Sequence, residues 1–446
     1  MKVVVIGCTH SGTAAVKNIV ALYPEAQVSV YEKNDNISFL SCGIALYVSG
    51  VAKDVNGLFY SSPKELKKLG VNTNLLHEVT NVDFENKLVS VTNLITKESF
   101  VDTYDKLIIS TGSWPIVPKI EGIEASNILL SKNFEHSTKI IEMTKHVNNI
   151  TVVGAGYIGV ELAEAFEVQG KKVVLIDAED RIMPKYLDQE FTDIAETAFK
   201  DHFVTLALGE MVQKFIQDDS GKVIKVQTNK NTYDTEMVIL CIGFRPNTLL
   251  FKHGVRTTPF GAIIVDEYMR TSREDVFACG DSATVYYNPT KENRYIPLAT
   301  NAVRMGTLVA RNLIKPTIKS IGTQGTSGIK IYDWNISSTG LTELVSKERN
   351  INYGTVTVKD NNRPEFMPEF EEVTLKIIFD KDSRILLGGQ IISKIDVTQI
   401  MNTLSVCIQK EMTVEELAFV DFFFQPHFNK PWNLLNLAGL EALDIK

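Results

Sequence analysis

The chain has 446 residues, which is enough for about three domains of roughly 150 residues each. Its 46 basic and 54 acidic residues give a net charge of −8, and this mild acidity argues against a nucleic-acid backbone or an anionic membrane surface as a partner. A hydrophobic content of 44% with 22% charged residues is typical of a soluble globular protein, and no apolar run approaches the roughly 20 residues of a membrane span. The apolar stretch at the N-terminus is too short for a signal peptide, so we expect a cytoplasmic location.

The first motif along the chain is a glycine turn between a strand and a helix. An apolar run over residues 3–6 precedes Gly7, a helical stretch follows Gly12, and a second apolar run ends at Glu32. This acid comes 20 residues after the last glycine (32 − 12), which is the spacing of a dinucleotide-binding βαβ unit. Thr9 stands where the middle glycine of that fingerprint belongs, so this copy alone is also compatible with an ordinary βα turn.

A complete copy of the pattern follows at residues 150–177. Three glycines at the fingerprint spacing, Gly154, Gly156 and Gly159, separate a strand from a helix, and the next strand ends at Asp177, 18 residues further on (177 − 159). The glycines allow a tight turn, a close approach to a pyrophosphate, and close packing of helix on strand. Two such units in one chain predict electron transfer between two dinucleotides, and NAD(P) and FAD are the obvious pair.

Later strands carry further signals. Two apolar strands stop at Gly112 and Gly243, as if the backbone there passes close to a ligand. Another strand leads to Asp281, which can accept hydrogen bonds from a ribityl chain; the alternative is a plain turn aspartate. From about residue 320 the pattern changes to strands such as 373–379 and a helix over 397–410, which predicts a separate α+β domain.

Five short motifs resemble the single-cysteine branch of the flavoprotein disulfide reductase superfamily, which comprises NADH oxidases, NADH peroxidases and coenzyme A-disulfide reductases. The motifs are GCTH at 7–10, SFLSCG at 38–43, GFRPN at 243–247, PLATN at 297–301 and FFFQPHF at 422–428. The resemblance covers essentially the whole chain and implies an α/β fold with two Rossmann-like dinucleotide-binding domains and a C-terminal α+β dimerisation domain. The expected boundaries are 1–113 and 247–319 for the FAD domain, 114–246 for the NAD domain and 320–446 for the dimerisation domain.

Cys42 is the candidate redox centre. The five cysteines are too few for a disulfide framework, and none has the C-x-x-C spacing of a zinc site, so we expect no metal. A C-x-x-x-x-C dithiol at Cys42 is excluded because Ile37 and Tyr47 occupy the partner positions. Cys42 is therefore either a structural thiol or a lone thiolate that cycles through sulfenic acid. A thiolate needs a neighbouring histidine, cation or helix N-terminus, and the resemblance places His10 beside it; a helix-cap or packing role is the alternative for His10.

The cofactor sites follow from the motif positions. We expect FAD to contact Gly7, Cys8, Thr9, Ser11, Gly12, Glu32, Ser110, Thr111, Gly112, Ser113, Lys132, Asp281 and Ala299. Glu32 is assigned to the adenosine ribose and Asp281 to the ribityl chain, while Lys132 and Ala299 come from the resemblance. We expect NAD(H) to contact Gly154, Ala155, Gly156, Tyr157, Ile158, Gly159, Glu161, Asp177, Tyr186 and Gly243. The Asp177 carboxylate predicts a preference for NADH over NADPH, with Arg181 as the one nearby residue that could turn toward a 2′-phosphate.

The resemblance implies an FAD-dependent NADH oxidase that reduces O2 by four electrons to water. Hydride passes from NADH to FAD, and Cys42 traps the peroxide that forms, with His10 as an acid-base or charge-stabilising partner. An NADH peroxidase shares nearly every one of these residues and is the first alternative. A coenzyme A-disulfide reductase is the second, although that branch carries tyrosines where this chain has the phenylalanines of 422–424. A non-enzymatic redox sensor that binds NAD(H) and FAD is the third.

The resemblance also implies a homodimer in which the C-terminal domain covers the active site of the partner. His427 lies in the motif near that interface, and no catalytic role can be derived for it from the sequence. The expected partners are therefore NADH, O2 or H2O2, and a second copy of the chain, with no nucleic acid and no membrane.

Overall fold

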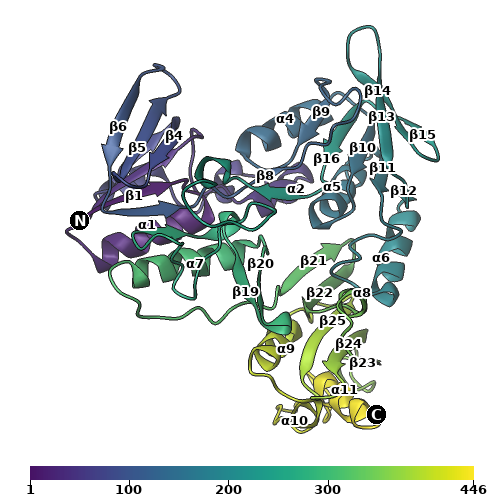
Figure 1. Cartoon of the computed structure of the whole chain (residues 1–446). Coiled ribbons are helices and arrows are strands. Elements are labelled where there is room, and N and C mark those ends of the chain that lie inside the picture. Colours follow the sequence, from purple (N-terminus) through teal and green to yellow (C-terminus); the bar gives the residue numbers. More distant parts are fainter. Residues whose placement is uncertain (446) are drawn as a thin grey trace.

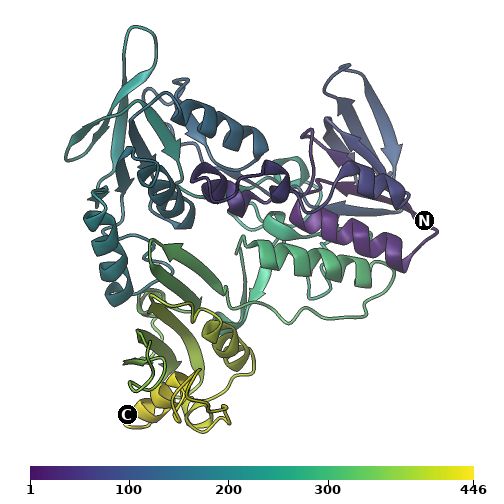
Figure 2. The same cartoon turned by 180° about the vertical axis from the view of Figure 1, so that it is seen from behind.

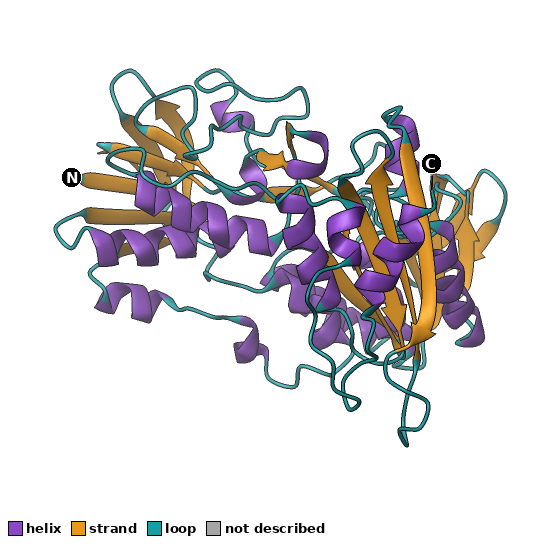
Figure 3. Ribbon diagram, turned by 90° about the horizontal axis from the view of Figure 1, so that it is seen from below, coloured by secondary structure: helices purple, strands orange, loops and turns teal. Residues whose placement is uncertain are grey.

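The computed structural model describes residues 1–445 and arranges them around three main sheets (Figure 1). The first sheet is parallel, in the order β18-β7-β1-β2-β3. Its strands are β1 (Lys2–Ile6), β2 (Gln27–Glu32), β3 (Asn72–Leu75), β7 (Lys106–Ile109) and β18 (Val276–Ala278). The Val- and Ile-rich β1 is central and buried, as expected of a parallel strand covered on both faces. Helices α1 (His10–Leu22) and α7 (Ala299–Asn312) pack side by side beneath this sheet (Figures 1 and 3).

A segment far along the chain completes the first sheet. Strand β18 pairs in parallel with β7, although the whole second unit lies between them in the sequence. The chain leaves and returns through a two-stranded antiparallel ribbon of β8 (Ser113–Pro115) and β17 (Phe244–Pro246). The first unit is therefore interrupted by the second, and the two connecting strands, β8 and β17, pair with each other. The exact domain boundaries stay predictions.

The second main sheet is also parallel and repeats the first unit. Its order is β12-β11-β10-β16-β9. The strands are β9 (Ile128–Leu130), β10 (Asn149–Val153), β11 (Lys172–Asp177), β12 (Thr205–Leu208) and β16 (Met237–Leu240), and the helices are α4 (Phe134–Thr144), α5 (Tyr157–Glu167) and α6 (Gln189–Asp201). The glycine turns that we expected therefore join β1 to α1 and β10 to α5. The prediction of two Rossmann-like units is confirmed.

The C-terminal part is an antiparallel sheet with helices, as predicted. Its order is β21-β22-β25-β24-β23. The elements are β21 (Ser327–Ile331), β22 (Trp334–Gly340), α8 (Glu343–Glu348), β23 (Tyr353–Asn361), β24 (Glu372–Asp380), β25 (Leu386–Ser393), α9 (Ile400–Gln409), α10 (Val414–Ala418) and α11 (Leu434–Leu443). Helix α9 begins at Ile400 rather than at the predicted residue 397, because Asp396 accepts the N–H and hydroxyl of Thr398 and holds a turn there.

Smaller elements fill the connections. They are α2 (Ile44–Val48), α3 (Pro63–Lys68), the antiparallel β4 (His77–Asp83), β5 (Leu88–Asn93) and β6 (Ser99–Thr103), the antiparallel β13 (Val212–Gln217), β14 (Val223–Thr228) and β15 (Thr232–Asp234), the hairpin of β19 (Val285–Tyr287) and β20 (Glu292–Arg294), and five short 3₁₀ turns, of which Ser41–Gly43 contains Cys42. Figure 2 shows the same arrangement from behind, with the segment that contains α2 between the two parallel sheets. Among the described residues, no helix is long and apolar enough to cross a membrane.

Candidate active site

The first glycine turn forms a cradle at the start of α1. Gly7 has a φ of +89°, and a Cβ on it would lie 2.5 Å from the Ser110 carbonyl oxygen. A Cβ on Gly12 would lie 2.2 Å from the Gly7 carbonyl oxygen, so both positions need glycine. Thr9 occupies the N-cap position of α1 without a side-chain cap bond, which leaves the first N–H groups of this helix for an anion. The turn therefore fits a pyrophosphate.

Glu32 closes this turn from the end of β2. The residue is only 4% exposed, and its carboxylate accepts the backbone N–H of Cys8 at 2.7 Å and that of Asn34 at 2.9 Å. Burial raises the pKa of Glu32, although these hydrogen bonds act in the opposite direction. An acid is thus held where the strand ends beside the glycine turn, which is the place that a ribose hydroxyl requires.

The second glycine turn repeats this geometry. A Cβ on Gly154 would lie 2.4 Å from the Cys241 carbonyl oxygen, and Gly156 is the N-cap of α5 without a side-chain cap bond. Asp177 accepts the backbone N–H of Ala155 at 2.5 Å, as Glu32 accepts that of Cys8. The two acids therefore occupy equivalent places in the two units.

Three polar side chains meet between the units. Ser113 donates its hydroxyl to Asp281 at 2.8 Å, and the Lys132 ammonium lies 2.9 Å from the Ser113 hydroxyl oxygen and 3.3 Å from the Asp281 carboxylate. Lys132 also lies over the ring of Phe244, 4.6 Å from its centroid. The structure thus brings together three residues that the sequence places in three separate segments. Of the neighbouring predicted residues, Ser110 bonds the Gly7 carbonyl at 2.7 Å, and Ala299 begins α7.

Cys42 lies in a short 3₁₀ turn that is fixed to the second unit. Its neighbours Phe39 and Ile44 belong to the apolar core that contains α5 and β10, and Gln169 at the end of α5 donates to the Val48 carbonyl at 2.6 Å. The residue itself is exposed. A cysteine encoded within the first unit is therefore held against the second.

The protein groups around Cys42 together raise the pKa of its thiol. Protein atoms around it raise the pKa of the thiol, and the negative charges of Glu161 and Asp281 raise it further, whereas Lys132 lowers it. Lys132 is thus the cation that the sequence argument required. Asp281 and Lys132 also influence His10, so the histidine and the cysteine share one charged pair.

His10 begins α1 and stacks on Tyr60. The two rings are 5.6 Å apart and inclined by 8°, and the Tyr60 hydroxyl lies 3.1 Å from Nδ1. The other ring nitrogen, Nε2, is buried without a hydrogen-bond partner in the described chain. Burial lowers the pKa of His10 and keeps the imidazole neutral near pH 7. No motif pointed to Tyr60, because its place beside His10 depends on a contact between residues 50 positions apart.

Two tyrosines and a carboxyl group lie close together on the second unit. The rings of Tyr157 and Tyr186 are 4.7 Å apart, and the Tyr157 hydroxyl lies 2.8 Å from that of Ser327 on β21. Glu161 lies one helical turn after Tyr157 on α5. Burial, with a smaller contribution from Glu164, raises its pKa to about 7.

Two further residues from the sequence argument lie elsewhere. Arg181 donates to Asp193 at 2.9 Å and to Thr192 at 3.2 Å, so its guanidinium is held by α6. His427 is exposed on the C-terminal segment, where its Nδ1 lies 2.9 Å from Gln425 and its carbonyl accepts from Arg363. Within the described chain, His427 has no hydrogen bond to the residues around Cys42.

Comparison with known proteins identifies this arrangement. Residues 1–306 match the pyridine nucleotide-disulphide oxidoreductase family, and residues 326–434 match its dimerisation domain. The chain belongs to this family. Among curated oxidoreductases of this kind, an NADH oxidase from Enterococcus faecalis is 53% identical over 444 residues, covering 100% of both chains, and one from Streptococcus pyogenes is 41% identical, covering 99% of this chain and 100% of the relative.

Solved structures of related oxidoreductases have the same fold. The water-forming NADH oxidase from Lactobacillus brevis, bound to NADH, superposes with a TM-score of 0.98 at 54% identity, covering 99% of this chain and 98% of that chain. An engineered water-forming NADPH oxidase made from that protein, bound to NADPH, gives a TM-score of 0.98 at 53% identity, with the same coverage. This likeness extends over both dinucleotide units and the C-terminal sheet.

Proposed function

We propose that this chain is an FAD-dependent NADH oxidase that reduces O2 to water. The observation that carries the proposal is that charged groups of both dinucleotide units, Asp281 of the first and Glu161 of the second, act on one cysteine, Cys42, in a chain that is 53% identical over its full length to an NADH oxidase. The proposed division is an FAD domain of 1–113 and 247–319, an NAD domain of 114–246 and a dimerisation domain of 320–446. We further propose a cytoplasmic location.

The first cradle fits FAD. Its glycine turn has no room for side chains, its helix N-terminus is uncapped, and its buried acid faces the ribose position. The proposed FAD contacts are Gly7, Cys8, Thr9, Ser11, Gly12, Glu32, Ser110, Thr111, Gly112, Ser113, Lys132, Asp281 and Ala299. Bound there, FAD supplies the transfer of electrons from NADH to O2.

The second cradle fits NADH. The proposed contacts are Gly154, Ala155, Gly156, Tyr157, Ile158, Gly159, Glu161, Asp177, Tyr186 and Gly243. We assign the Asp177 carboxylate to the ribose 2′-hydroxyl, where it repels the 2′-phosphate of NADPH. The ion pair of Arg181 with Asp193 keeps that guanidinium from reversing the preference. The engineered NADPH oxidase supports this assignment, because its five substitutions include the replacement of an aspartate by alanine and the introduction of two arginines.

We assign the trapping of peroxide to Cys42. Its thiolate attacks one oxygen of H2O2, the O–O bond breaks, and the products are Cys–SOH and a hydroxide ion. Lys132 stabilises the thiolate. We infer that the Tyr60 hydroxyl donates to Nδ1 of His10, so that Nε2 carries a hydrogen and donates a hydrogen bond to the leaving hydroxide, which takes a proton from solvent and departs as water. NADH then supplies two electrons that, with one proton, reduce Cys–SOH to the thiolate and a second water.

An oxygen electrode with a peroxide assay tests the oxidase proposal. We expect two NADH oxidised per O2 and no residual H2O2. In Cys42→Ser the ratio should fall to one NADH per O2 with one H2O2 released, while Ser41→Ala, a matched change at the adjacent residue, should keep the ratio of the parent. Production of water alone by Cys42→Ser would refute the role of the thiol. Oxidation of NADH only after peroxide is added, without uptake of O2, would favour the NADH peroxidase, and no steady oxidation of NADH would favour the redox sensor.

The C-terminal part supports a homodimer. It matches a dimerisation domain over residues 326–434, and a group of large apolar side chains is exposed there. These are Phe419, Phe423, Phe424, Phe428 and Trp432. Such a cluster is large for a free surface and suits a second copy of the chain. Sedimentation should give a dimer, and Phe424→Asp should shift it toward the monomer; a monomeric parent chain would refute the proposal.

A further inference from the structure

A buried lysine joins the C-terminal sheet to the second dinucleotide unit. Lys376 on β24 is 2% exposed, and its ammonium lies 2.6 Å from Glu190, 2.5 Å from Glu343 and 3.1 Å from Asp188. Asp188 and Glu190 lie at the start of α6, whereas Glu343 begins α8 of the C-terminal part. Burial opposes the charge of Lys376, but hydrogen bonds to Glu190 and Glu343 raise its pKa, so the ammonium stays protonated.

The backbone N–H and both carboxylate oxygens of Asp188 make hydrogen bonds to the C-terminal part. Its backbone N–H donates to Gln390 on β25 at 2.6 Å, and Gln390 donates back to the carboxylate at 2.7 Å. The other carboxylate oxygen accepts the backbone N–H of Glu343 at 2.9 Å. Asp188 is the N-cap residue of α6, yet its side chain makes no cap bond to that helix. An acid that ordinarily satisfies its own helix is thus used to fix the helix start to another domain.

The chain that enters this cluster carries Tyr186. Upstream, the Met183 N–H donates to the Ala155 carbonyl at 2.9 Å, within the second glycine turn. Leu187 is buried, while Tyr186 is 42% exposed with its ring 4.7 Å from that of Tyr157. The position of Tyr186 is therefore set between two anchors, the glycine turn on one side and Asp188 on the other.

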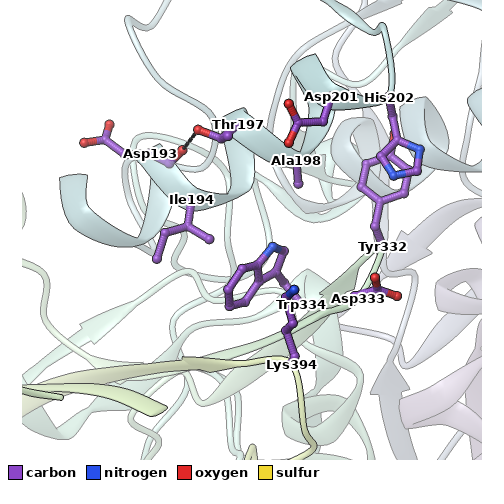
Figure 4. Close-up of a pocket in the computed structure, with 10 residues that line it drawn as sticks. All are labelled: Asp193, Ile194, Thr197, Ala198, Asp201, His202, Tyr332, Asp333, Trp334 and Lys394. Carbon is purple, nitrogen blue, oxygen red and sulfur yellow. Dashed lines mark hydrogen bonds between the residues drawn. The ribbon is translucent and has the colours of Figure 1, made fainter. Parts of the chain in front are cut away.

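The rest of α6 packs in an apolar core that also contains residues of the C-terminal strands β21, β22 and β25. At its far end, His202 stacks on Tyr332 with the ring centroids 3.6 Å apart. Between the two ends, a hollow of about 510 Å³ separates the exposed side of α6 from Tyr332 in the turn before β22 and from Trp334 at the start of β22 (Figure 4). The beginning of α6 is thus held in two ways, by the buried Phe191 in the apolar core and by the charged cluster around Lys376, which ties Asp188 to the C-terminal sheet.

We propose that Lys376 is a positioning residue for the NADH site, which holds Tyr186 against Tyr157 through Asp188 and so determines the affinity for the nicotinamide cofactor. The inference rests on the proposed NADH site at these tyrosines. Tyr157 has its own link to the C-terminal part through Ser327 on β21. Both tyrosines are thus held by the C-terminal sheet, each through a different contact.

The test uses Lys376→Met in the FAD-loaded protein, with Lys359→Met on the neighbouring strand β23 as the matched control, because Lys359 is exposed. We expect Lys376→Met to raise KM for NADH and the Kd for NAD⁺, measured by calorimetry, about tenfold, with kcat within about twofold. The control should leave all three constants unchanged. A folded Lys376→Met protein with unchanged Kd, or with a fall in kcat and no change in KM, would overturn the inference.

A double-mutant cycle separates positioning from a general loss of structure. In a Tyr186→Ala background, Lys376→Met should weaken NAD⁺ binding by less than about twofold, because the side chain that it positions is gone. Additive losses would overturn the inference. If Lys376→Met does not fold, Asp188→Asn, which keeps the shape of the side chain, replaces it under the same criteria. A parent protein that binds NAD⁺ but does not oxidise NADH with O2 would refute the proposed function, while the calorimetric cycle still decides the role of Lys376.

Discussion

Replacement of Glu161 by Gln should make the protein more stable above pH 4.5, by an amount that grows with pH and is largest at neutral and alkaline pH. The pKa of Glu161 is raised from 4.5 to about 7, and at ~1.4 kcal/mol for each pKa unit this corresponds to at most about 3.5 kcal/mol. Because the pKa is raised, the folded protein keeps a proton that the unfolded chain has lost. This contribution is fully present below pH 4.5 and is lost as the pH rises through 7. Gln cannot ionise, so the free energy of unfolding of the variant should not show this decrease as the pH rises.

Urea unfolding of the FAD-loaded protein at pH 5, 6, 7 and 8 measures this difference. The free energy of unfolding of Glu161→Gln should exceed that of the parent by an amount that grows with pH and levels off above pH 7. Glu142→Gln is the control, because Glu142 is exposed, bonds Lys145 at 2.7 Å and has a lowered pKa. Parallel pH profiles for the parent and Glu161→Gln would refute the argument that burial holds this carboxyl group protonated.

Other predictions concern the turns and the thiol. Asp177→Ala should raise kcat/KM for NADPH relative to NADH about tenfold or more, since like charges in contact cost several kcal/mol; an unchanged ratio would contradict the ribose assignment. Gly7→Ala should lower the ratio of absorbance at 450 nm to that at 280 nm in the purified protein, whereas Gly70→Ala, at a similar φ of +82° but with open space around it, should not. Iodoacetamide labelling of Cys42 should begin at a lower pH in Glu161→Gln, because the charge that raises the thiol pKa is removed; identical labelling profiles would count against that coupling.

Local patterns were enough to predict the two dinucleotide units. A glycine whose Cβ would lie within about 2.5 Å of a backbone oxygen is a requirement that one short segment imposes, so Gly7 and Gly154 could be recognised from the sequence. The same holds for Glu32 and Asp177, which lie at a fixed distance along the chain from their turns. The α/β class and the C-terminal α+β part followed from the same periodicities.

Contacts between distant segments could not be predicted in this way. The pairing of His10 with Tyr60, the place of Glu161 near Cys42 and the cluster around Lys376 all depend on how the units pack, and no spacing along the chain encodes them. The sequence around Lys376 does not distinguish a buried lysine from an exposed one, because its three carboxylate partners come from other segments of the chain. Side chains that tune the site were therefore harder to find than the backbone that holds the cofactors.

The late arrival of β18 sets an order for folding during synthesis. After Ile109 is made, 169 more residues (278 − 109) must follow before its partner Ala278 is made. At roughly 5–20 residues per second, β7 keeps an unpaired edge for roughly 10 to 30 s, and such an edge invites pairing with other chains. The second unit, from β9 to β16, is continuous and is complete before that time. The nascent chain should therefore bind NAD(H) before it can bind FAD, and the supply of FAD should affect the yield of folded protein at a late step.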